Sequence, residues 1–138
     1  MNIFTAQIPD WLTMKCEAIR LRLEGIEVFK KLTQEEKDKE WNGIGPDRFP
    51  AWFRNALSVL HKCVLPAACI HDFDFVVGGT IEEFHAANKR MKRNMKVCLK
   101  DSRKEFSFFG YHLARWRIHE AYRLVEKYGL PGWKMKAA

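Results

Sequence analysis

Apolar side chains recur at helical spacing through much of the chain, and residues 80–99 show the clearest pattern. At steps of three or four residues, one face of this segment carries Ile81, Phe84, Asn88, Met91, Met95 and Cys98. This spacing predicts an amphipathic α-helix, and Asn88 is the only strongly polar member of the face. Thr80, with Glu83 three residues later, forms the capping box that is typical of a helix start.

Two helices are predicted upstream of this segment. Apolar steps of three and four residues predict a first amphipathic helix over residues 10–24, and Gly25 offers its stop. Thr33 and Glu36 form a second capping box, which opens a short charged helix that runs into Asn42.

Three more helices complete the predicted pattern. One covers residues 50–61, and the next covers residues 66–77, where no helix breaker occurs before Gly78 and Gly79. The two glycines end that helix and allow a tight reversal of the chain. An aromatic and basic helix follows, including Phe106, and it ends near Tyr128.

The chain shows no strand alternation, internal repeat or low-complexity linker, so the predicted fold class is all-α. We expect a small helical bundle with a central antiparallel hairpin and extra terminal helices. With 138 residues, 47% hydrophobic and 30% charged, the chain fits a single globular domain. Its predicted parts are an N-terminal helix (1–32), a core (33–100) and a C-terminal helix with a tail (101–138).

The predicted hairpin brings His71 and Asn88 together. His71 lies about seven residues before the glycine turn and Asn88 about nine after it, so both stand two turns up the hairpin. A buried imidazole and a buried amide each need a hydrogen-bond partner, which the other supplies. The sequence therefore predicts a contact between them, and a satisfied core histidine is the alternative to a catalytic one.

Asp72 is turned by about 100° from His71 on the same helix and can face another part of the chain. We expect it to face the stretch around Gly43 and Gly45, where glycines allow backbone carbonyls to converge. A carboxylate with several carbonyls is the ligand set of Ca²⁺. A surface salt bridge for Asp72, and an ordinary turn for the two glycines, are the alternatives.

Three segments in order carry a family resemblance. They are Asn42-Gly43-Ile44-Gly45-Pro46, Ala68-Cys69-Ile70-His71-Asp72, and Gly78-Gly79-Thr80 followed by Ala87-Asn88. Together they resemble the phospholipase A2 superfamily, and more closely a group of small phage and prophage proteins similar to it. The resemblance covers about residues 40–98 and leaves the first and last helices outside.

The resemblance implies a Ca²⁺-dependent hydrolysis of a phospholipid ester. It makes His71 the general base, Asp72 the side-chain Ca²⁺ ligand, and the carbonyls around Trp41, Gly43 and Gly45 the other ligands. Two residues depart from the family pattern: Phe75 stands where that pattern has tyrosine, and Asn88 where it has aspartate.

Both departures fall in the network that orients the base. An amide accepts from an imidazole N–H but does not stabilise the imidazolium by charge, and the corresponding change in a serine-protease triad costs roughly 10⁴ in rate. A weak or degenerate hydrolase is the first expected function. A non-catalytic phage or prophage scaffold or binding protein, built on the same hairpin, is the alternative.

The net charge of +7 is uneven, because residues 1–47 carry −2 and residues 48–138 carry +9. The expected anionic-partner residues on the 80–99 helix and just beyond are Lys89, Arg90, Lys92, Arg93, Lys96 and Lys100. Phospholipid or an anionic membrane surface is the expected partner, with nucleic acid or a virion protein as the alternative. A simple solvated face is the third interpretation.

Four scattered cysteines favour reduced thiols over a stapled secreted scaffold. His61, Cys63, Cys69 and His71 are residue types of a zinc site, but their spacing does not match the usual zinc patterns. No secretion signal opens the chain, and no segment approaches the roughly 18 apolar residues of a membrane span. We therefore expect a cytoplasmic or virion-associated protein.

Overall fold

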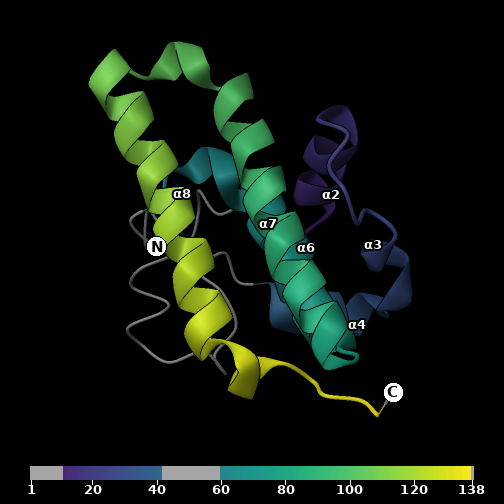
Figure 1. The fold of residues 1–138 in the computed structure, drawn as a ribbon. Coiled ribbons are helices and arrows are strands. Elements are labelled where there is room, and N and C mark those ends of the chain that lie inside the picture. The colour runs from purple at the N-terminus through teal and green to yellow at the C-terminus, as the bar shows by residue number, and fades with distance from the viewer. Residues whose placement is uncertain (1–10, 42–59, 138) are drawn as a thin grey trace, which may run out of the picture.

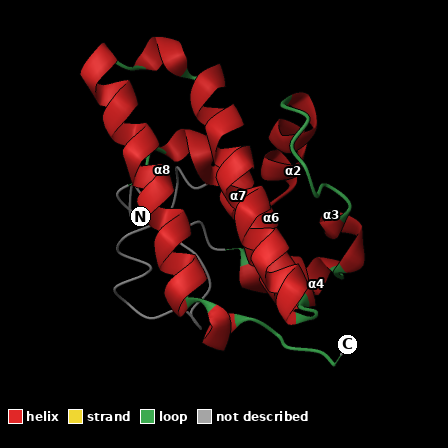
Figure 2. Cartoon of the chain, in the orientation of Figure 1, coloured by secondary structure: helices red, strands yellow, loops and turns green. Residues whose placement is uncertain are grey.

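Helices form almost all of the regular structure. The computed structural model describes residues 11–41 and 60–137, and within these ranges it contains no strand beyond an isolated bridge between Gly79 and Met135 (Figure 2). The all-α prediction is confirmed. The predicted helix over residues 50–61 lies outside the described ranges except for Leu60 and His61, which are not helical.

The N-terminal part contains three helices: α2 (Trp11–Arg20), α3 (Val28–Lys31) and α4 (Gln34–Glu40). The first is shorter than the predicted 10–24, because Arg22 adopts a left-handed φ of 55° that ends the helix before Gly25. The predicted capping box of Thr33 and Glu36 is present at the start of α4.

The central pair of helices is α6 (Leu65–Val77) and α7 (Ile81–Asp101), joined through Gly78, Gly79 and Thr80. The two helices pack along one another (Figure 1). Gly78 has a φ of 71°, as the predicted reversal requires, and the capping box of Thr80 and Glu83 starts α7. From Pro66 to Phe75, α6 is buried except at Ala68, so it forms the centre of the core.

The last long helix, α8 (Phe108–Tyr128), lies against α7 on the side away from α2 (Figure 1). A 3₁₀ turn, η2 (Arg103–Glu105), joins α7 to it. Ser107 caps α8 by accepting a hydrogen bond from the Gly110 N–H at 3.0 Å. The helix therefore starts after Phe106, which the sequence pattern had placed inside it.

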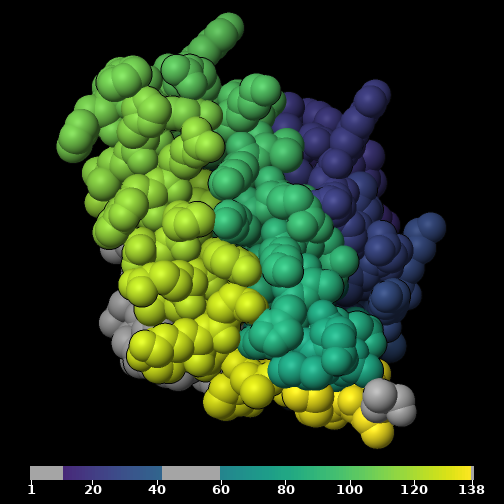
Figure 3. Space-filling view, viewed as in Figure 1, coloured from purple at the N-terminus to yellow at the C-terminus, as the bar shows by residue number. Residues whose placement is uncertain are grey.

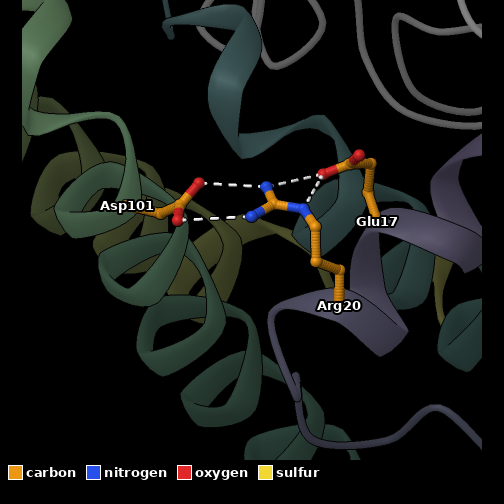
Figure 4. A network of polar contacts seen from close by, with 3 residues as sticks. All are labelled: Glu17, Arg20 and Asp101. Carbon is orange, nitrogen blue, oxygen red and sulfur yellow. Dashed lines mark hydrogen bonds and ion pairs between the residues drawn. The ribbon is translucent and has the colours of Figure 1, made fainter.

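Polar side-chain contacts connect the N-terminal part to α7. The Asn94 amide accepts from the N–H of Glu24 and donates to its carbonyl, both at 2.9 Å, so one side chain satisfies both backbone groups of that residue. Arg20 lies between Glu17 and Asp101 at 2.7 and 3.0 Å (Figure 4). The Asn94 side chain is buried. The ion pairs of Arg20 are exposed, and exposed ion pairs contribute little to stability.

The tail after α8 returns to the hairpin turn. A 3₁₀ turn, η3 (Leu130–Gly132), leads to Trp133, which is buried. Backbone hydrogen bonds then join Gly79 to Lys134 at 3.0 Å and to Lys136 at 2.8 Å. The C-terminal segment covers the end of the hairpin in the space-filling view (Figure 3).

Candidate active site

The buried contact between His71 and Asn88 is the centre of the candidate site. His71 projects from α6 and Asn88 from α7, and the imidazole Nε2 lies 2.8 Å from the amide Oδ1. Their exposed fractions are 3% and 0%. The predicted contact is confirmed, and it follows from the equal height of the two residues above the turn.

A third residue, which sequence reasoning missed, extends this contact. The Asn88 Nδ2 donates to Glu126 Oε2 of α8 at 2.6 Å, and Glu126 Oε1 lies 2.8 Å from His85 Nδ1. Glu126 is 38 residues from Asn88 in the sequence. The spacing of residues within a helix does not indicate which side of α7 receives α8, so no local signal predicts this carboxylate.

The hydrogen bonds determine how the amide and the imidazole are oriented. A carboxylate only accepts, so the NH₂ group of Asn88 faces Glu126 and the amide oxygen faces His71. That oxygen must receive a proton, and the His71 Nε2 therefore carries the N–H. In the neutral ring Nδ1 then holds the lone pair, which makes it the basic atom of the site.

Phe75 has a packing role at the position where the family pattern has tyrosine. Its ring is fully buried, and its centroid lies 4.5 Å from that of His71, 5.8 Å from Phe84 and 5.1 Å from Trp133. A hydroxyl on this ring would enter an aromatic cluster and require a polar partner there. The apolar ring thus supports one side of the imidazole by packing.

The expected Ca²⁺ ligands are only partly within the described residues. Asp72 is 2% exposed on α6, and Trp41 is buried as the C-cap of α4, with its N–H donating to Lys37 O at 3.0 Å. Gly43 and Gly45 lie outside the described ranges. Within residues 11–41 and 60–137, no three His, Cys, Asp or Glu side chains are placed to share a metal ion.

A second buried acid lies one turn from the site. Asp74 Oδ2 accepts from Arg90 Nη2 at 2.8 Å, and the Asp74 side chain is 11% exposed. Burial raises the pKa of Asp74 to about 6, against the opposing effect of the Arg90 charge. Arg90, one of the residues expected to meet an anionic partner, thus forms an ion pair with a buried acid of α6.

Other basic residues of α7 also have contacts within the protein. Arg93 pairs with Glu24 at 2.6 Å, and both side chains are more than half exposed. Lys92 lies over the Tyr122 ring at 4.7 Å, while burial and the charges of Lys92 and Arg115 lower the pKa of Lys96.

Comparison of the chain with protein-family models, with curated proteins and with solved structures found no match. Across the described residues, no helix combines the length and the apolar character that crossing a bilayer requires.

Proposed function

We propose that this protein is a Ca²⁺-dependent, phospholipase A2-like hydrolase of carboxylic esters, with His71 as its general base. The observation that carries the proposal is the 2.8 Å contact between His71 Nε2 and Asn88 Oδ1. It holds the imidazole in the tautomer whose lone pair is on Nδ1, which is the form that a general base requires. The site is built on two packed helices, so the orientation of the ring is fixed.

In this proposal His71 Nδ1 takes a proton from water as the water oxygen attacks the ester carbonyl. The same proton then passes to the leaving alkoxide as the acyl C–O bond breaks, which yields a fatty acid and an alcohol. Asp72 is the donor type that Ca²⁺ prefers, and it is adjacent to the base, so it fits as the side-chain ligand. Bound Ca²⁺ supplies Lewis acidity toward the ester carbonyl.

Release of fatty acid from anionic vesicles tests this function. The parent in Ca²⁺ should release fatty acid slowly but above the blank rate, and His71→Gln should reduce the rate to the blank. His119→Gln is the matched control, because this histidine is exposed on α8. No release by the parent at any Ca²⁺ concentration would refute the proposal.

Thermal melting tests the metal site without turnover. Ca²⁺ should raise the melting temperature of the parent, since a ligand that binds the folded state stabilises it. The increase should vanish in Asp72→Asn and persist in Asp74→Asn, which removes a buried acid from the same helix. If Ca²⁺ changes the melting temperature of both variants equally, Asp72 is not the ligand of the metal.

The proposed partner is an anionic phospholipid surface. The lysines that support it are Lys89, Lys92, Lys96 and Lys100 of α7. At the start of α8, Phe108 and Phe109 are 77% and 76% exposed, and aromatic rings partition into the headgroup region of a bilayer. Binding to phosphatidylglycerol vesicles should weaken with salt and with Phe109→Ser, whereas equal binding to neutral vesicles would contradict it.

The second candidate is a non-catalytic scaffold that binds nucleic acid or a virion protein through the same basic surface. The burial of both His71 and Asp72 favours it, because neither side chain opens to bulk solvent. Under this candidate, Ca²⁺ leaves the melting temperature unchanged and no variant alters fatty acid release. The two experiments above therefore separate the candidates.

A further inference from the structure

We propose that Glu126 is a positioning residue that acts on His71 through the Asn88 amide. This inference rests on the proposed function for its catalytic consequence, but its structural part is independent of turnover. It assigns a role to a residue of α8, outside the segments that carry the family resemblance. Asn88 has no carboxylate of its own. Glu126 would supply one, a single hydrogen bond further from the imidazole.

The chain of contacts is short and partly shielded from water. Nε2 to Oδ1 is 2.8 Å, and Nδ2 to Oε2 is 2.6 Å, a length typical of a hydrogen bond to an ionised acceptor. Asn88 is completely buried, and the Glu126 side chain is 24% exposed. These contacts join three helices, because the residues belong to α6, α7 and α8.

Glu126 acts on the imidazole through the orientation of the Asn88 amide. It fixes that orientation, because the reversed amide would place two acceptor oxygens against each other. With the amide oxygen held 2.8 Å from Nε2, the neutral ring carries its proton on Nε2.

Other titratable groups face Glu126 and contribute to its state. His85 of α7 contacts Oε1, and its side chain is 47% exposed. On α8 itself, burial and then the Glu126 charge raise the pKa of Tyr122. His85→Gln keeps a hydrogen-bond donor opposite Oε1, so it separates any effect of the His85 charge from that of Glu126.

Nitrogen NMR of the His71 ring tests the inference directly. In the parent, the neutral ring should carry its proton on Nε2. Glu126→Gln retains the size of the side chain but replaces an acceptor-only carboxylate with an amide, so the orientation of Asn88 is no longer fixed and the Nδ1–H tautomer of His71 should become populated. An unchanged tautomer would overturn the inference.

The matched control is Glu120→Gln. Glu120 lies on the same helix with a side chain 30% exposed, and it pairs with Arg123 at 3.0 Å. Its substitution makes the same change in net charge away from Asn88, so the His71 signals should remain as in the parent. A shift equal to that of Glu126→Gln would show a general charge effect and overturn the specific role.

Fatty acid release gives a second readout. Glu126→Gln should lower kcat on the order of tenfold with little change in KM, because the substitution changes the tautomer of the base and not the binding of substrate. If the parent releases no fatty acid, the proposed function fails while the NMR result still decides the role of Glu126. If kcat and KM stay at parental values, the catalytic part of the inference fails.

Discussion

The indole Nε1 of Trp133 donates a hydrogen bond to the carbonyl oxygen of Gly79 at 3.0 Å. This contact joins the segment after α8 to the turn between α6 and α7. The same indole packs edge-on against Phe75, which in turn contacts His71. The C-terminal segment thus supports the ring that supports the imidazole.

Gly78→Ala should destabilise the protein by about 2 kcal/mol or more, as measured by urea unfolding. Gly78 has a φ of 71°, and a Cβ there would overlap the backbone carbonyl of Lys134, so both conformation and space oppose a side chain. Trp133→Phe should cost about 1 kcal/mol, because it removes the indole N–H but keeps an aromatic ring. Equal stability of Gly78→Ala and the parent would contradict this account.

The protein should become less stable as the pH rises from about 4 to about 6, because Asp74 ionises at a higher pH in the folded state than in the unfolded state. Because burial raises the pKa of Asp74 to about 6 from the model-compound value of 3.8, the folded state binds more protons than the unfolded state in that window. The free energy of unfolding contributed by this group should fall by about 2 to 3 kcal/mol across it.

Asp74→Asn isolates this effect. The difference in unfolding free energy between parent and variant should change across that pH window, because the other carboxyl groups cancel. Glu24→Gln is the control, since Glu24 pairs with Arg93 at the surface with a side chain 53% exposed. If the difference in unfolding free energy between the parent and Asp74→Asn stays constant from pH 4 to pH 6, Asp74 has the same pKa in the folded and unfolded states, which would contradict the prediction.

Asn88→Asp alone should destabilise the protein, although it introduces the residue type that the phospholipase A2 pattern has at the matching position. The introduced carboxylate would face Glu126, whose Oε2 now accepts from the Asn88 amide at 2.6 Å. The double variant Asn88→Asp with Glu126→Gln replaces that repulsion with an amide donor, so it should regain stability and release fatty acid faster than the parent. A double-mutant cycle should give a favourable coupling of about 1 to 3 kcal/mol, and additive single effects would contradict it.

Cysteine labelling at pH 8 should follow burial. Cys16 is exposed and should react first, whereas burial raises the pKa of Cys63 to about 11 and that of Cys98 to about 12. Cys69 is buried and its pKa is raised further, so Cys69 and Cys98 should be alkylated only on unfolding. Mass spectrometry of the alkylated peptides measures the order, and early labelling of Cys69 would contradict the packing of α6.

Features that depend on local spacing were predicted correctly. The start of α7 follows from the capping box at Thr80, and the contact of His71 with Asn88 follows from two helices of known rise joined by a short turn. The apolar stripe of α7 is buried as expected from Phe84 to Cys98, while Ile81 is 36% exposed at the helix start.

Features that depend on distant pairing were missed. Glu126 and Asn94 are single polar residues, and nothing in their local sequence indicates the buried amide or the backbone that each one contacts. Arg90 belonged to a dense run of basic residues, and its pairing with Asp74 depends on the crossing of α6 and α7. Periodicity predicts which residues share a face, but not which partner that face meets.

The distance between Asn88 and Glu126 along the chain also has a consequence for biosynthesis. During translation, Asn88 is made 38 residues before the carboxylate that accepts from its amide. The nascent hairpin therefore has to wait for α8 before its amide is satisfied on both sides. A ribosome that stalls within that interval would carry a hairpin whose candidate site is not yet assembled.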